Sequence, residues 1–177
     1  FLMIFTLVFR TDSNLLDIIG KINLSAIFNT FLGSTITAII CVSVSLFVIL
    51  NFPKKGKKIR FIFENFIYFG FTLPGLVVAL SFVYFAVNYF FQIYQTWTIL
   101  ILGYSVLFLS SGYGPIRTSI ELVGDKYMIT SKSLGKNSLT TFLNISLPLY
   151  KPGILKGFLN IFILTAKELP VTLILAP

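Results

Sequence analysis

The chain has 177 residues, of which 56% are hydrophobic and only 11% are charged. A soluble domain has about a quarter charged residues, so the composition is that of a membrane protein with no room for a large soluble domain. The net charge of +8 does not indicate a nucleic-acid partner, because most basic residues lie in two segments, 54–60 and 117–156, between apolar stretches. Cytoplasmic loops of membrane proteins carry this excess of Lys and Arg.

Little in the chain suggests catalysis or a bound metal. Cys41 is the only cysteine and histidine is absent, which excludes a disulfide within these residues and a metal site of the usual nitrogen and sulfur ligands. No nucleophile–base pair is visible, so we expect neither an enzyme nor a cofactor. Gly135 and Lys136 lack the following Ser or Thr and the upstream Gly of a nucleotide-binding loop. Any ATP hydrolysis must therefore come from another subunit.

The beginning of the chain contains one clear span. Residues 1–9 are too short to cross a bilayer, and residues 10–21 mix both signs of charge, as an outside loop does. A charge-free stretch follows, long enough for a helix of about 20 apolar residues, and we place a span at 26–50. The sequence begins inside an apolar run without an initiator Met, so we expect it to be part of a longer chain.

The interval from Asn65 to Ile116 has no charge and is too long for one helix. It predicts two spans, at 61–87 and 97–116, that run out and back between two inside segments. An interface belt of aromatic residues marks the outside turn between them: Tyr89, Tyr94 and Trp97.

Two features of the first of these spans predict local structure. Leu73-Pro74-Gly75 should kink or break the helix, since proline lacks an amide donor and its ring clashes with the preceding turn. Glu64 follows directly after the lysine-rich segment 54–60. We expect it to form an interfacial salt bridge with that segment and not to act in a proton relay.

Residues 125–153 form the longest polar interval between two apolar regions. Asp125 can cap one short helix and Gly135 can end it, while Ser138 can cap a second helix that stops before Pro148. Helical spacing gives each helix a shared face: Tyr127, Ser131 and Leu134 on the first, Phe142 and Ile145 on the second. The stretch therefore predicts two short helices joined by a glycine turn, outside the bilayer.

A last span is predicted at 152–170, with Pro152 in its first turn, where the missing amide is harmless. At about 1.5 Å per residue, Lys167 lies roughly 22 Å along this helix, within or near the outer edge of the hydrocarbon. Ionisable residues at such depth are costly and usually face a pathway or a partner. We therefore expect Lys167, Glu168 and Pro170 to belong to the pathway or the outer gate; a charge at the outer interface is the alternative.

The stretch 125–153 resembles the signature loop of permease subunits of binding-protein-dependent ABC importers. That pattern is Glu-Ala-Ala, three residues, Gly, nine residues, Ile, any residue and Leu-Pro. Ile129-Thr130-Ser131 stand in the place of Glu-Ala-Ala, so an isoleucine replaces the acid. The later residues fall at the family spacing: Gly135, Ile145, Leu147 and Pro148.

Other segments are similar to the same family. Asn29-Thr30 and Leu73-Pro74-Gly75 resemble segments at the starts of the family's second and third helices. Lys167-Glu168-Leu169-Pro170 resembles the equivalent segment of ferric iron permeases. The resemblance extends over about 29–177 and implies an all-α, polytopic membrane protein of the type I ABC importer fold, with a single permease domain over 1–177 and a cytoplasmic coupling loop at about 117–151.

The resemblance also implies a function and a set of partners. The chain would pass ferric iron from an extracytoplasmic binding protein through a bacterial inner membrane, together with a second permease half or subunit. The loop would act as a coupling helix seated in a groove of a cytoplasmic ATPase, whose closure rocks the spans between two access states. The residues implied in this coupling are Tyr127, Ile129, Thr130, Ser131, Leu134, Gly135, Phe142, Ile145, Leu147 and Pro148.

Three alternatives stay open at this stage. The first is the same machine with another cargo, such as thiamine, a polyamine, sulfate or a phosphonate. The second is an ion-coupled secondary transporter, which would need acidic residues in mid-span, and the interval 65–116 has none. The third is a non-transporting remnant, favoured by Ile129 in the place of the acid and by the apolar runs at the ends of the chain.

Overall fold

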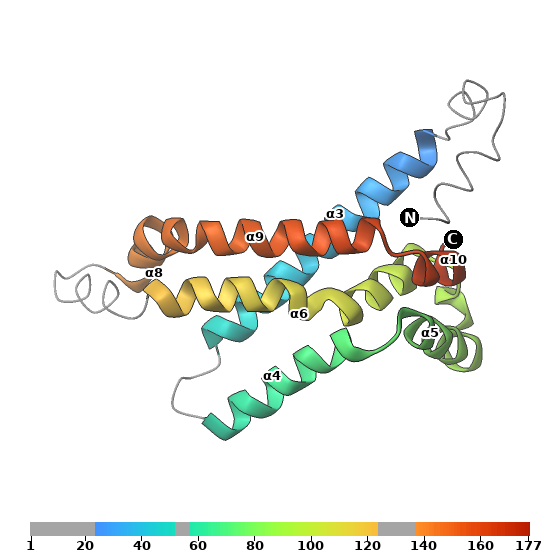
Figure 1. Ribbon diagram of the computed structural model, residues 1–177, viewed down its shortest axis with the longest axis horizontal. Helices are drawn as coiled ribbons and strands as arrows, with labels where there is room; N and C mark the ends of the chain where they lie inside the picture. The colour runs from blue at the N-terminus through green and yellow to red at the C-terminus, as the bar shows by residue number, and fades with distance from the viewer. Residues whose placement is uncertain (1–23, 52–56, 124–136) are drawn as a thin grey trace, which may run out of the picture. The chain divides into compact units, whose positions relative to one another are not determined.

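The computed structural model describes residues 24–51, 57–123 and 137–177. These residues are helical, without a strand, and are joined by short turns (Figure 1). Their contacts divide the chain into a unit that ends at Phe31 and a second unit, Leu32–Pro177, and the contacts described below lie within the second. The elements in chain order are α3 (Leu24–Asn51), α4 (Lys57–Thr72), α5 (Gly75–Tyr89), η1 (Phe91–Ile93), α6 (Trp97–Val123), α8 (Ser138–Thr141), η2 (Phe142–Ser146), α9 (Leu147–Ala166) and α10 (Pro170–Leu175).

Helix α3 covers the predicted stretch 26–50 and extends slightly beyond it. Its buried side consists largely of small side chains, which allow helices to approach closely. Thr37 is fully buried, and its hydroxyl donates a hydrogen bond to the Gly33 carbonyl at 2.8 Å, which satisfies this buried hydroxyl. The Cys41 thiol lies 4.0 Å from the Ser105 carbonyl oxygen of α6.

The predicted span 61–87 is divided at the predicted place. Helix α4 ends at Thr72 and α5 begins at Gly75, with a bend of 102° between Phe61–Thr72 and Gly75–Tyr89. Pro74 has extended backbone angles (φ −63°, ψ 133°) and precedes the first residue of α5. A proline locks its own φ and pushes the preceding residue out of the helical region. The expected break is confirmed, and the bend is so large that one continuous span over 61–87 is excluded.

Helix α6 begins at Trp97, as predicted, but it does not end near Ile116. It continues through Pro115 to Val123, so the first residues of the predicted loop 117–151 are helical. Proline within a helix removes one hydrogen bond, and it is tolerated when a neighbouring helix packs against the freed backbone. Helix α9 packs closely beside this proline, since a Cβ on Gly153 would lie 2.8 Å from the Pro115 carbonyl oxygen.

The predicted stop at Pro148 is wrong. Ser138–Thr141 is α-helical, Phe142–Ser146 forms a π-turn, and α9 follows at Leu147 without a gap, with Pro148 and Pro152 both inside it. The Leu147 amide donates to the Phe142 carbonyl, five residues back. A proline ring normally clashes with the carbonyl four residues before it. Pro148 follows the π-turn as the second residue of α9, in the first turn, where a missing amide costs little.

The last predicted span, 152–170, also has different bounds. Helix α9 starts at Leu147, ends at Ala166, and is followed by the turn Lys167–Leu169 and the short helix α10. Pro170 is the first residue of α10, the helical position at which a proline costs least. The Lys-Glu-Leu segment therefore lies between two helices and not on the face of one.

The most extensive packing between two described helices lies between α6 and α9, which run antiparallel (Figure 1). A Cβ on Gly153 would lie 2.8 Å from the Pro115 carbonyl oxygen, and a Cβ on Gly157 would lie 3.0 Å from the Gly112 carbonyl oxygen. The first distance is too short for a real Cβ and the second is tighter than most, so the glycines allow these backbones to approach closely. The same pair contributes fully buried Ile116 and Ile161 to the core.

Among the described helices, α3 and α6 are long and apolar enough to cross a bilayer, and the bent pair α4–α5 would be a third span if it counts as one. Helix α9 is not in this group, and its first half holds two exposed lysines, Lys151 and Lys156. The start of α4, the end of α6 and the start of α8 lie at one end of the bundle (Figure 1). The two basic segments adjoin these helix ends in sequence, and their placement on one side of the membrane stays a prediction.

Candidate functional site

Only part of the predicted coupling surface falls within the described residues. Its first half lies outside them, together with Asp125: Tyr127, Ile129, Thr130, Ser131, Leu134 and Gly135. Its second half lies on η2 and the start of α9. Phe142 is half-buried and packs against the hydrophobic core, whereas Leu143 is 56% exposed and Pro148 is also exposed. Phe142 thus serves internal packing, and the exposed apolar surface of this turn is on the neighbouring Leu143.

Ile145 and Leu147 are intermediate in exposure. The predicted shared face of Phe142 and Ile145 assumed α-helical spacing, in which residues three apart are neighbours. The π-turn over Phe142–Ser146 changes that spacing. The side chains presented to a partner by this segment therefore differ from those expected for an ordinary helix.

The predicted pathway residues lie at the break between α9 and α10. Lys167 and Pro170 are exposed, and Glu168 is partly buried. The Glu168 carboxylate lies directly against Gly75, the first residue of α5: its Cδ is 3.4 Å from the place that a Cβ of residue 75 would occupy, and its Oε1 is closer still. Two segments singled out by sequence, Leu73-Pro74-Gly75 and Lys167–Pro170, therefore meet in space.

The N-terminus of α5 stabilises the negative charge of the nearby Glu168 carboxylate. The first amides of a helix have no partner within the helix and give its N-terminus a partial positive charge. Pro74 provides no side-chain cap for α5, so Glu168 is the anionic group next to that terminus. Neither Lys167 nor Glu168 forms an ion pair with another described residue.

A hydroxyl pair ties α10 to α6 beside this contact. The Thr172 hydroxyl donates to the Glu168 carbonyl, and it lies 2.6 Å from the Tyr104 hydroxyl oxygen. A threonine hydroxyl has one proton, so Tyr104 must be the donor to Thr172. Glu168 is thereby connected to α6 through its backbone and to α5 through its side chain.

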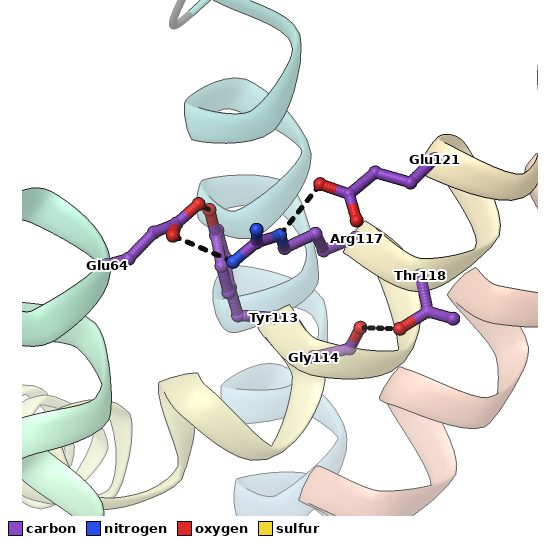
Figure 2. Close-up of polar contacts among 6 residues, drawn as sticks. All are labelled: Glu64, Tyr113, Gly114, Arg117, Thr118 and Glu121. Atoms are coloured by element: carbon purple, nitrogen blue, oxygen red, sulfur yellow. Dashed lines mark hydrogen bonds and ion pairs between the residues drawn. The ribbon is translucent and has the colours of Figure 1, made fainter. Parts of the chain in front are cut away.

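A second polar cluster lies near the other end of α6 (Figure 2). Arg117 Nη1 is 2.7 Å from Glu64 Oε2, and Arg117 Nε is 2.9 Å from Glu121 Oε1. The Tyr113 hydroxyl donates to Glu64 Oε1 at 3.2 Å. Glu64 belongs to α4 and the other three residues to α6, so the cluster joins the two helices.

A salt bridge at Glu64 was predicted from the sequence, but with the lysine-rich segment 54–60 and not with Arg117. The signal was present, because Glu64 and Arg117 are the two charges that bound the charge-free interval from Asn65 to Ile116. An out-and-back pair returns both bounding residues to the same side of the membrane. Opposite charges there are natural partners, since an unpaired charge near hydrocarbon is costly.

Comparison with known proteins agrees with this architecture. Residues 48–177 match the family model described as the binding-protein-dependent transport system inner membrane component. The chain belongs to this family. The permease subunits of the family are membrane proteins and not enzymes, which agrees with the all-α fold and the apolar helices.

One relative of this permease is the Fe(3+)-transport system permease protein FbpB 2 of Haemophilus influenzae. The two are 32% identical over 152 residues, which is 86% of this chain and 30% of the relative. The permease described here therefore spans about 30% of the length of the curated relative that it matches.

Proposed function

We propose that the chain is part of the membrane-spanning subunit of an ATP-driven importer for ferric iron. It would receive iron from an extracytoplasmic binding protein, pass it to the cytoplasm, and work with a separate ATPase and a second permease half or subunit. The family match and the ferric iron permease among its relatives support this proposal. The bacterial inner membrane is the corresponding location.

The observation that supports the proposal most is the position of the polar stretch 124–146 between two closely packed helices. It connects α6 and α9, two helices that pack at backbone contact. A force applied to the stretch by an ATPase would therefore move both helices together. A coupling segment needs such a mechanical link, because ATP can drive transport only by favouring one conformer over another.

The roles of Lys167, Glu168 and Pro170 in the pathway or outer gate remain part of the proposal. Their support is the position of a partly buried carboxylate where two broken helices meet, next to the N-terminus of α5. Ionisable groups in membrane segments usually mark a pathway or a partner. The expected result for Glu168→Gln is slower iron uptake with the ATPase still bound.

The cargo is tested by uptake in cells that lack their own ferric iron importer. The complete protein, expressed with its ATPase and binding protein, should restore uptake of radioactive ferric iron, and depletion of ATP should abolish that uptake. Thiamine, spermidine, sulfate and a phosphonate serve as competing cargoes in the same cells. Uptake of one of these without iron would replace the cargo assignment, and uptake that survives ATP depletion would indicate an ion-coupled transporter.

The coupling role is tested by co-purification with the ATPase. Gly135→Pro should abolish the complex, because proline there cannot adopt the turn that presents the two segments of the loop. Gly135→Ala, which keeps the amide, should weaken the complex less. If the parent protein retains no ATPase at all, the importer assignment is wrong and the non-transporting remnant gains support.

A further inference from the structure

Helix α4 contacts α6 at three levels, and the contacts differ in kind. Next to the break at Pro74, Gly70 lies against the Val106 carbonyl group, with the carbonyl carbon 3.2 Å from the place of a Cβ. Further along, the rings of Tyr68 and Tyr113 meet edge to face with centroids 6.1 Å apart. Farthest from the break is the ion pair of Glu64 and Arg117.

Gly70 is suited to act as the fixed point of α4. It touches backbone atoms, which cannot move aside as a side chain can, and it lies a few residues from the 102° bend. Glu64 is six residues away on the same helix, or roughly 9 Å along the axis. A small rotation of α4 about Gly70 would leave that contact in place and displace the Glu64 end.

The ion pair is built so that it can open at limited cost. The guanidinium group of Arg117 is shared between two carboxylates, Glu64 on α4 and Glu121 on its own helix (Figure 2). The planar fork of an arginine permits two such bonds at once. If α4 moves away, Glu121 continues to neutralise Arg117, which avoids the large penalty of an isolated charge.

The position of the pair links it to the coupling stretch. Arg117 lies six residues before the end of α6, roughly 9 Å along the helix, and the stretch follows directly. Since α6 and α9 pack through glycines at backbone contact, they respond to that stretch as one body. Arg117 is the charged group by which this body holds the inner end of α4.

We propose that the Glu64–Arg117 ion pair is a make-or-break latch that joins α4 to the α6–α9 pair in one access state and opens in the other. This proposal rests on the proposed importer function. Arg117 and Glu64 are positioning residues in it and do not bind cargo. The pair stabilises the conformer in which it is closed relative to the one in which it is open. An ATP-driven cycle acts by shifting the balance between two such conformers.

The first test uses the complete transporter reconstituted in liposomes, with ATP hydrolysis and cargo uptake measured together. Glu64→Gln and Arg117→Gln should each lower the cargo moved per ATP hydrolysed by about fivefold or more, the lower range of conformational coupling effects, with subunit assembly unchanged. Thr118→Ala is the matched control, because Thr118 is exposed on the same helix and bonds only back to the Gly114 carbonyl. Equal coupling ratios in the parent and both Gln variants would overturn the latch.

Charge reversal separates a specific pair from loss of folding. Because Arg117→Glu would face Glu121, the reversal combines Glu64→Arg, Arg117→Glu and Glu121→Arg. It should recover most of the coupling ratio that the single variants lose, and a reversal no better than Glu64→Gln would count against the latch.

A reversible cross-link tests whether the contact must open. A reducible thiol reagent that joins Glu64→Cys to Arg117→Cys, in a Cys41→Ala background, should stop uptake until the link is reduced. Full uptake by the linked protein would overturn the proposal. Failure of the parent transporter to couple hydrolysis to any cargo is a different result, since it rejects the proposed function itself.

Discussion

Helices α9 and α4 both pack along α6, and the two interfaces are held by different forces. Against α9 the contact is between backbones, through Gly112, Gly153 and Gly157. Against α4 it depends on one glycine near the bend and, farther along, on long charged side chains. Steric contact between backbones permits one spacing, whereas an ion pair between flexible side chains can be lost and remade.

This difference assigns mechanical roles to the two interfaces. Protein interiors packed to crystal-like density transmit strain and do not deform continuously, so α6 and α9 should move as one body. The end of α4 that holds Glu64 has no such constraint. Helix α6 thus forms a rigid pair with α9 on one side and an adjustable contact with α4 on the other.

The largest expected effect comes from disturbing the rigid interface. Gly153→Ala places a methyl group against Ser119 and 2.8 Å from the Pro115 carbonyl oxygen. Overpacking of this kind costs about 1–3 kcal/mol, and here the obstacle is partly backbone. Thermal unfolding of the purified protein should occur well below that of the parent.

Gly114→Ala is the matched control for this prediction, because the nearest atom to its Cβ is the Tyr68 hydroxyl oxygen at an ordinary 3.7 Å. Equal stability of Gly153→Ala and Gly114→Ala would show that the two helices can separate freely. The contrast between the interfaces would then disappear.

The next effect concerns the ion pair. A double-mutant cycle with Glu64→Gln and Arg117→Gln should give a coupling energy of about 1–2 kcal/mol, within the usual range for residues in one network. The side chains are only 13% and 28% exposed, so solvent weakens the attraction less than at an open surface. Unfolding of the four proteins in parallel measures the coupling, and additive effects would remove the energetic basis of the latch.

A smaller effect is expected from Tyr113→Phe. This change removes the hydrogen bond to Glu64 but keeps the ring that meets Tyr68 edge to face. Loss of one hydrogen bond to a carboxylate in this setting should cost about 1 kcal/mol. Tyr68→Phe, which keeps the ring contact on the other side, provides the comparison, and a larger loss there would assign the stabilisation to Tyr68.

The smallest effect is expected from Glu121→Gln. Its side chain is 48% exposed and its bond to Arg117 is within one helix turn, a pair worth about 0.3–0.5 kcal/mol. The unfolding temperature should change little, and raising the salt concentration should reduce the difference further. A loss as large as that of Glu64→Gln would mean that Glu121, and not the interhelical pair, fixes Arg117.

Sequence reasoning succeeded where local chemistry decides the structure. Pro74 ends α4 and Trp97 begins α6 because proline geometry and interfacial aromatics act over a few residues. It failed at Pro148, since the π-turn that accommodates this proline is not encoded by any single residue. Side-chain pairing between α4 and α6 was also missed, because Glu64 and Arg117 become neighbours only after the out-and-back pair has formed.

The candidate sites, too, could be predicted from the sequence only in part. The sequence indicated Glu168 as a costly charge in a membrane segment, yet its neighbour Gly75 could not be inferred from spacing, because the break at Lys167–Leu169 was expected to be helical. Six of the ten predicted coupling residues lie outside the described part of the chain, and their roles stay predictions.

The π-turn at Phe142–Ser146 has a consequence for the orientation of everything on either side of it. Each residue of an α-helix turns the next by about 100°, and a π-turn adds a residue to one turn. One residue therefore sets how far the segment that begins at Ser138 is rotated, about the helix axis, relative to the glycine face of α9. Deleting the exposed Asn144 would rotate one relative to the other by about a quarter of a circle, so the turn fixes the direction in which α8 leaves the start of α9.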